Sequence, residues 1–228
     1  MLPRQPLERT GKLCRVDLPE FVQVTQQPRA DCPLDRGSFF GGQCHTHPSF
    51  PAASICRRMT QNAHTTNEVP TCEAALQIAM EQTDFTLHGA ACLVIGHGRI
   101  GALLARKLHA LGASVTVSAR SARDFARIQA DGLRVLDTRR LAGHLGGFPL
   151  IFNTVPAPVL GRAELAGLSR GTLLIDLASL PGGVAPDAPL PEGCRLLPAL
   201  SLPGKVAPRS AARAIYDTVC AILEEELP

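Results

Sequence analysis

Three glycines in the segment VIGHGRIG, residues 94–101, form the pattern with the clearest chemical meaning in this sequence. They follow an apolar run typical of a buried strand and precede a stretch with the spacing of a helix. In such a strand–loop–helix unit, Gly96 permits a tight turn, Gly98 lets a pyrophosphate approach the backbone, and Gly101 lets the helix pack closely on the strand. The segment therefore predicts a dinucleotide-binding loop, with a purely structural turn as the alternative.

The helix after the glycines would supply the second half of this site. Its first residues, Arg99 and Ile100, would offer backbone N–H groups and the positive end of the helix dipole to the phosphates. We therefore expect both residues to bind the cofactor together with the three glycines.

The end of the next expected strand, in VTVSARSARD, indicates which dinucleotide binds. NAD sites usually place an acidic residue there, on the ribose 2′-hydroxyl. Here the strand end carries Arg120 and Ser121, and the first carboxylate, Asp124, lies inside the following helix. A guanidinium can hold a 2′-phosphate with two hydrogen bonds, and a serine can add another. The sequence predicts NADP(H) rather than NAD(H), with a solvated surface charge as the alternative reading of Arg120.

Three later loops are expected to line the same crevice, because the carboxyl ends of parallel strands share one edge of a sheet. Asn153, Thr154 and Pro156 follow one strand and are predicted to bind the cofactor. Asp176 ends the next strand and is the nearest candidate for a general base, while Lys205 is a candidate anchor for a substrate carboxylate. The alternative is structural, because Asn, Asp, Gly and Pro are also the ordinary residues of turns.

Strands and helices alternate from residue 67 onward, which is typical of a doubly wound parallel sheet. The pattern predicts an α/β, Rossmann-like NAD(P)-binding domain over residues 67–228, with a first helix near Pro70. The expected strands are 91–95, 114–118, 133–136, 150–153, 173–177 and 194–197, and the further helices are 99–111, 122–130, 138–145, 159–168 and 208–225.

Residues 1–66 differ in composition from the rest of the chain. They are rich in Pro, Gln, Arg, Cys and Thr and show no sustained period of a helix or a strand. We expect an irregular or disordered extension, with a segment outside the native reading frame as the alternative. No function is predicted here.

Charge and hydropathy narrow the classes of partner. The net charge of +3, without a Lys/Arg cluster, argues against nucleic acid as a ligand. No apolar run reaches the roughly 18 residues that a membrane span requires, and the N-terminus lacks the apolar core of a signal peptide. The expected location is the cytoplasm, with no membrane or nucleic-acid partner.

The eight cysteines are expected to be free thiols, because a cytoplasmic chain of this size seldom carries disulfides. Cys44, His45 and His47 form a cluster that could touch a metal. A second pair of ligands at the usual spacing is missing, so no metal site is predicted.

The motifs NEVPTCEAALQIAMEQTDFTLHG, VIGHGRIG, VTVSARS, IFNTVP, LIDLASLPGG and LPGKVAP occur in this order and spacing. Together they resemble the A subunit of dipicolinate synthase, over the region from residue 67 to the end. The glycine motif is generic, whereas LIDLASLPGG combined with LPGKVAP is much more specific.

The resemblance implies an oxidoreductase that uses NADP⁺ to form dipicolinate, pyridine-2,6-dicarboxylate, during sporulation. It implies oxidation of dihydrodipicolinate, derived from 4-hydroxy-tetrahydrodipicolinate, in the mother-cell cytoplasm. It also implies a partner, the B subunit, and is compatible with a homo-oligomer.

Two features depart from this family. The family carries a further N-terminal domain, whose pattern residues 1–66 lack, and it usually has Leu or Phe where this chain has His97. Two alternative functions follow: another Rossmann dehydrogenase, of the 2-hydroxy-acid or shikimate type, or a truncated nucleotide-binding protein without catalysis.

Overall fold

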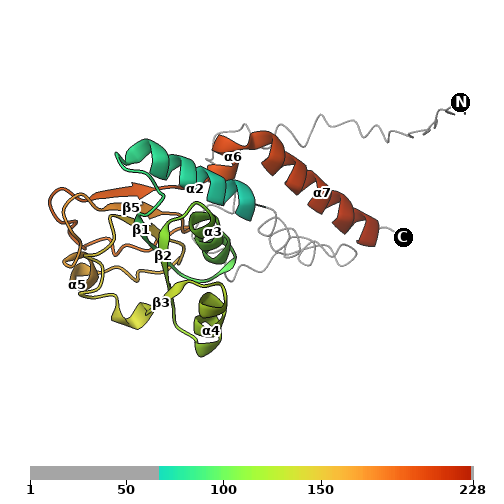
Figure 1. Ribbon diagram of the computed structural model, residues 1–228. Coiled ribbons are helices and arrows are strands. Elements are labelled where there is room, and N and C mark those ends of the chain that lie inside the picture. Colours follow the sequence, from blue (N-terminus) through green and yellow to red (C-terminus); the bar gives the residue numbers. More distant parts are fainter. Residues whose placement is uncertain (1–66, 227–228) are drawn as a thin grey trace, which may run out of the picture. The chain divides into compact units, whose positions relative to one another are not determined.

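Six parallel strands form one sheet in the order β3-β2-β1-β4-β5-β6 (Figure 1). The computed structural model describes residues 67–226. This strand order is that of a doubly wound nucleotide-binding fold, so the predicted fold class is confirmed. The strands are β1 (Ala91–Ile95), β2 (Ser114–Ala119), β3 (Arg134–Asp137), β4 (Leu150–Asn153), β5 (Leu173–Asp176) and β6 (Arg195–Pro198).

Helices connect these strands and cover the sheet on two sides. Figure 1 shows α2, α3 and α4 on one side of the sheet and α5 on the other. Pro70 lies in the first turn of α2, as the sequence predicts. The helical elements are α2 (Glu68–Gln82), α3 (Arg99–Ala110), α4 (Ala122–Ala130), the 3₁₀ turn η2 (Thr138–Arg140), α5 (Arg162–Leu165), α6 (Leu202–Val206) and α7 (Pro208–Glu226).

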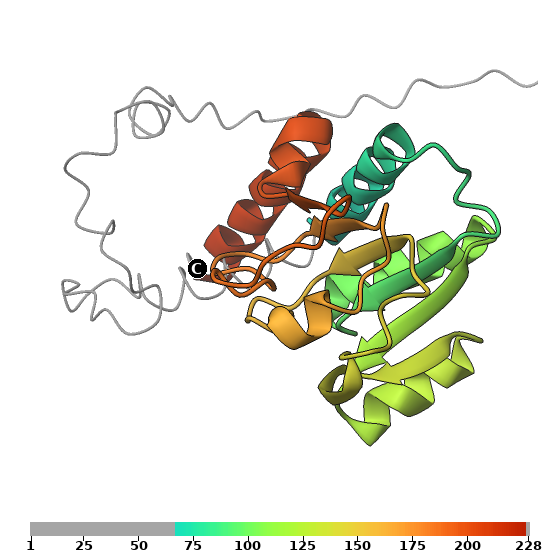
Figure 2. The ribbon, with the colours of Figure 1, turned by 90° about the vertical axis from the view of Figure 1, so that its left-hand side faces the viewer.

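Two apolar cores lie on the opposite faces of the sheet, which is seen from another side in Figure 2. Side chains alternate along β1, so that Cys92 and Val94 enter the core beneath α2 and α3, whereas Leu93 and Ile95 enter the other. All four are fully buried. A central strand covered on both faces needs such an unbroken apolar run, and this run fixes where the loop after β1 begins.

Three expected elements differ from the structure. The helix expected at 138–145 is reduced to η2, because Gly143 turns the chain with a φ of 75°. The helix expected at 159–168 is reduced to α5, because the N–H groups of Val159 and Leu160 donate to the carbonyl oxygen of Gly183 instead. The loop expected before the last helix contains the short helix α6.

Some predictions fall on residues that the structure does not describe. The irregular extension 1–66 and the cluster of Cys44, His45 and His47 lie outside the described residues. Within residues 67–226, no group of three or more His, Cys, Asp or Glu side chains is placed to hold a metal ion. None of the helices in this range has both the length and the apolar character that crossing a bilayer would require.

Candidate cofactor-binding site

The strand register brings the predicted site residues to one edge of the sheet. Ile95 at the end of β1 lies beside Ser118 of β2 and Asn153 of β4, and Asn153 lies beside Asp176 of β5. All of these strands are parallel, so the loops that follow them leave from the same edge. We call this the carboxyl edge, formed by the residues that end β1, β2, β4 and β5. A crevice at this edge is where doubly wound folds bind dinucleotides.

The glycine loop after β1 is packed tightly at its two ends and open in the middle. Gly96 has a φ of 99°, and a Cβ there would lie 2.6 Å from Oγ1 of Thr154. A Cβ on Gly101 would overlap the carbonyl oxygen of Gly96. A Cβ on Gly98, by contrast, would meet no heavy atom of the described residues within 4 Å. The open side of Gly98 is the space that a pyrophosphate needs to approach the backbone.

Helix α3 begins directly at this opening. Gly98 is its N-cap, and the carbonyl oxygen of Gly98 accepts a hydrogen bond from the N–H of Ala102 at 2.9 Å. The first turn of any α-helix leaves N–H groups without an intrahelical partner, and these suit an anion. Arg99 pairs with Glu68 of α2, with 3.4 Å between Nε and Oε1. Ile100 packs against the core. Cofactor binding by Arg99 and Ile100 stays a prediction.

The end of β2 presents an exposed arginine and a capping serine. Arg120 is exposed, whereas Ser121 is the N-cap of α4. Oγ of Ser121 accepts a hydrogen bond from the N–H of Asp124 at 3.1 Å and donates one to Oδ2 of Asp124 at 2.6 Å. The Ser121 hydroxyl, and to a lesser extent the ring of His97, lower the pKa of Asp124. Asp124 is therefore ionised, and its carboxylate already accepts a hydrogen bond from Ser121, the N-cap of its own helix.

His97 is a residue of this site that the sequence prediction did not include. Its side chain is only 6% exposed, and its Nδ1 lies 3.6 Å from Oδ1 of Asp124. That separation is longer than a hydrogen bond, and the two groups form an ion pair only when the imidazole is protonated. Neither ring nitrogen has a hydrogen-bond partner within the described part of the chain. The signal in the sequence was a polar residue inside a glycine loop of a family that usually has an apolar one there.

Asn153 and Asp176 form a buried hydrogen-bonded pair between the ends of β4 and β5. Nδ2 of Asn153 donates to Oδ1 of Asp176 at 2.7 Å. The same carboxylate accepts hydrogen bonds from the N–H of Ala178 at 3.1 Å and the N–H of Gly183 at 2.8 Å. Asn153 is fully buried and Asp176 is 7% exposed. The pair therefore ties the loop 177–183 to the sheet.

The side chains of Asn153 and Thr154 are directed at the protein itself. Oδ1 of Asn153 accepts a hydrogen bond from the N–H of Val155 at 3.1 Å, and Oγ1 of Thr154 donates to the carbonyl oxygen of Ile95 at 2.9 Å. Thr154 thereby fills the space beside the glycines, whereas Pro156 is exposed beyond it. Cofactor binding by Asn153, Thr154 and Pro156 stays a prediction.

Lys205 lies in α6, the short helix that follows the end of β6. It is exposed in the last turn of α6, and α6 packs against α2 and α7 (Figure 1). The structure brings Asn153 together with Asp176, and Thr154 together with the glycines. It records no contact between Lys205 and either group within the described residues. A role for Lys205 in binding substrate stays a prediction.

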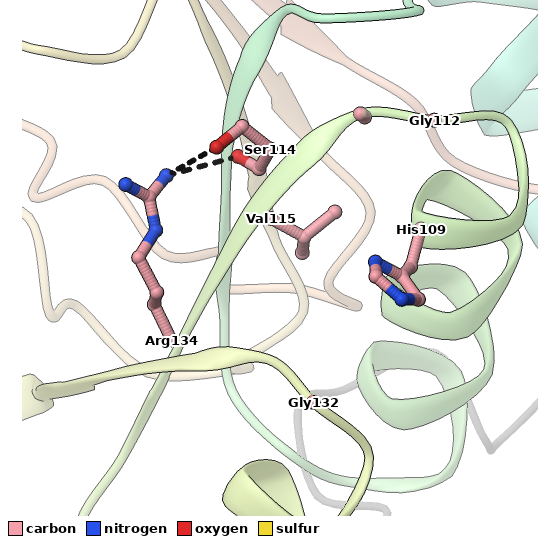
Figure 3. Close-up of a pocket in the computed structure, with 7 residues that line it drawn as sticks. His109, Gly112, Ser114, Val115, Gly132 and Arg134 are labelled. Atoms are coloured by element: carbon pink, nitrogen blue, oxygen red, sulfur yellow. Dashed lines mark hydrogen bonds between the residues drawn. The ribbon is translucent and has the colours of Figure 1, made fainter.

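A groove at the opposite edge of the sheet was not predicted from the sequence. It is lined by His109 at the end of α3, by Ser114 and Val115 of β2, and by Arg134 of β3 (Figure 3). Nη2 of Arg134 donates to Oγ of Ser114 at 2.8 Å. We call this the amino edge, because strands β2 and β3 begin there.

Comparisons with known proteins support an NAD(P)-binding fold. A family described as putative NAD(P)-binding matches residues 85–180. The A subunit of dipicolinate synthase from Bacillus subtilis (strain 168) is 41% identical over 117 residues, which are 51% of this chain and 39% of that protein. The resemblance to this dipicolinate synthase family is confirmed.

Solved structures give the same result for the fold. The crystal structure of the dipicolinate synthase A chain from Bacillus subtilis matches with a TM-score of 0.69 and 36% identity, over 72% of this chain and 55% of that one. The corresponding structure from Bacillus halodurans matches with a TM-score of 0.66 and 37% identity, over 71% and 55%. The chain thus spans little more than half the length of these relatives. Its described part is a Rossmann-like NAD(P)-binding domain.

Proposed function

We propose that this chain is the cofactor-binding part of an NADP-dependent oxidoreductase that converts dihydrodipicolinate into dipicolinate. The observation that carries this proposal is the 41% identity to the A subunit of dipicolinate synthase. The reaction removes one hydride and one proton from a dihydropyridine ring, and a bound NADP⁺ supplies the acceptor for the hydride. The chain itself then has to bind the cofactor, position the ring and hold two carboxylates.

The glycine loop and α3 would hold the pyrophosphate. The open side of Gly98 supports this assignment, because it leaves the approach to the backbone free. Arg120 supports a 2′-phosphate, because it is exposed at the end of β2 where an acid would select NAD. Asp124, the acid that follows, is occupied by Ser121 and faces His97. We infer that NADP(H) is preferred over NAD(H).

The loop 177–183 would shape the nicotinamide side of the crevice. Asp176 holds this loop through the N–H groups of Ala178 and Gly183. Two of the hydrogen bonds that Asp176 accepts fall on Oδ1 and one falls on Oδ2, so the acceptor site left for a substrate proton is on Oδ2. The positioning of the loop by Asp176 follows from these contacts, and Oδ2 is the proposed general base.

Lys205 is the proposed anchor for one substrate carboxylate. It is exposed on α6, close in sequence to the start of α7. We further propose that this chain works together with a B subunit in the cytoplasm of a sporulating mother cell, as the resemblance implies.

Titration calorimetry with NADPH and NADH tests the cofactor assignment. The protein should bind NADPH several-fold more tightly than NADH. Arg120→Ala should cost about 1.5–3 kcal/mol of NADPH binding free energy, the usual worth of a charged hydrogen bond, and leave NADH binding nearly unchanged. Arg123→Ala, at an exposed position in the first turn of α4, is the matched control and should change neither. Equal affinities for the two cofactors would contradict the NADP assignment.

Turnover tests the reaction. When the chain is joined at residue 67 to the N-terminal domain that the family carries, dihydrodipicolinate, NADP⁺ and a B subunit should give dipicolinate and reduced cofactor in equal amounts. Lys205→Met should remove this turnover and keep NADPH binding. Reduction of NADP⁺ by a 2-hydroxy acid or a shikimate-type substrate, without dipicolinate formation, would favour the alternative dehydrogenases.

A further inference from the structure

The side chain of His97 is buried in the glycine loop and has no hydrogen-bond partner among residues 67–226. Its side chain is 6% exposed, and both ring nitrogens lack a hydrogen bond within the described residues. Buried polar groups nearly always have partners, so an imidazole in this state calls for an explanation. The polar group that it does face is the carboxylate of Asp124, with Nδ1 and Oδ1 3.6 Å apart.

Asp124 is held from two sides. Oδ2 accepts the hydroxyl hydrogen of Ser121, and Oδ1 faces the ring of His97. His97 lies in the loop after β1 and Ser121 in the loop after β2, and these two strands are neighbours in the sheet. The carboxylate is thus clamped where the adenosine half of a dinucleotide lies in this fold.

An acid at this place has a direct effect on cofactor choice. A free carboxylate would accept a hydrogen bond from the 2′-hydroxyl of NAD(H) and would repel the 2′-phosphate of NADP(H). In the segment from Ala119 to Asp124, Asp124 is the only acidic residue. Whether it is free or clamped therefore decides how the charge of Arg120 acts on the ligand.

We propose that His97 is a specificity-determining residue, which holds the Asp124 carboxylate against the glycine loop so that Arg120 alone faces the 2′-phosphate. His97 acts through Asp124 and is a positioning residue. The inference rests on the NADP preference proposed above. It concerns this chain in particular, because an apolar residue at this position could not hold a carboxylate.

A double-mutant cycle on His97→Leu and Asp124→Asn tests this assignment, with the ratio of NADH to NADPH dissociation constants as the readout. His97→Leu should lower the preference for NADPH by about fivefold or more, because the Asp124 carboxylate is then free to approach and repel the 2′-phosphate. In the Asp124→Asn background the same change should leave the ratio within about twofold, because no charge is left to release. His97→Asn, which keeps an N–H donor near Nδ1, should retain most of the preference of the unchanged protein.

A purely structural role for His97 gives a different result. His97→Leu would then weaken both cofactors equally, or would shift the ratio by the same factor in both backgrounds, and either result overturns the proposal. If thermal melting shows that His97→Leu does not fold, Asp124→Asn alone still decides. Its ratio should stay within about twofold of the unchanged protein because the charge is already clamped, and a tenfold rise in the preference for NADPH would overturn the proposal.

The unchanged protein separates this inference from the proposed function. No preference for NADPH, or no binding of either cofactor, would contradict the proposed function. A clear NADPH preference that His97→Leu leaves intact would contradict only the role of His97.

Discussion

The two edges of the sheet are built differently. At the carboxyl edge, polar side chains are buried, as in Asn153 and Asp176, or half-buried, as in Thr154, and they bond to backbone groups. At the amino edge, the groove in Figure 3 is lined by more exposed groups, and its hydrogen bonds join the exposed side chain of Arg134 to Ser114. A second groove there is lined by residues such as Gln82 and Arg195.

The difference shows that a groove in the surface is not by itself a binding site with preorganised groups. The grooves of the amino edge have an open surface, but the polar contacts that shape them are exposed to water. The carboxyl edge has its loops fixed in advance by buried hydrogen bonds and close backbone packing, with open space left at Gly98. Groups that are already held in place lose less conformational entropy when the ligand binds. Cofactor binding requires such preorganised groups.

The largest effect is expected where the backbone itself is packed at the carboxyl edge. Gly101→Ala places a methyl group on the carbonyl oxygen of Gly96, which cannot move without displacing the end of β1. The free energy of unfolding should fall by about 3–4 kcal/mol, measured by urea denaturation. Gly98→Ala is the matched control and should stay within about 1 kcal/mol, because its methyl group meets open space. Equal stability of the two variants would contradict the tight packing of the loop.

The next effect concerns the buried pair at the ends of β4 and β5. Asp176→Ala leaves the amide of Asn153 and the N–H groups of Ala178 and Gly183 without their acceptor. Unpaired buried donors should lower the free energy of unfolding by about 2–3 kcal/mol. Asp187→Ala, at an exposed position, should change it by less than about 0.5 kcal/mol. If denaturation curves of the two variants coincide, the pair does not hold the loop.

A smaller effect is expected in the alkylation rates of two cysteines, one near each edge of the sheet. Sγ of Cys72 lies against the carbonyl oxygen of Ile100 in the first turn of α3, and burial raises the pKa of this thiol to about 12. Cys194, just before β6, is a half-buried free thiol. The thiolate is the reactive form, so iodoacetamide at pH 8 should label Cys72 at least about tenfold more slowly than Cys194.

Site-resolved mass spectrometry measures this difference, and labelling in urea is its control. Unfolding should remove the contrast, because both thiols are then exposed. Equal rates in the folded protein would show that α2 and α3 open at the carboxyl edge more readily than their packing indicates.

Much of the fold could be predicted because the local sequence patterns indicate the same strands and helices that the sheet contains. The apolar run of β1, the glycines after it and the helix spacing of α3 are all features of neighbouring residues. The shortening of the helix at 138–145 came from Gly143, and that of the helix at 159–168 from a backbone pairing with Gly183. The second cause is a long-range contact, which periodicity does not report.

Features of the candidate site could be predicted where they depend on a single strand and the loop that follows it. The contacts of Asn153 with Asp176 and of His97 with Asp124 join separate loops, and they depend on the register between strands. The sequence therefore indicated that Asn153 and Asp176 lie at the carboxyl edge, but it did not indicate that they bind each other. Nor did it show that Asp124 is clamped, because that requires the relative placement of two loops.

The central claim is that the carboxyl edge, opened at Gly98, binds the cofactor. Titration of NADPH into the unchanged protein, Gly98→Val and Arg134→Ala tests it most directly, with circular dichroism to verify the fold of each. The branched side chain at Gly98 would occupy the space for the pyrophosphate, so Gly98→Val should stay folded and lose NADPH binding. Arg134→Ala, which alters only the amino edge, should bind NADPH like the unchanged protein. Normal binding by Gly98→Val, or loss of binding by Arg134→Ala alone, would contradict the claim.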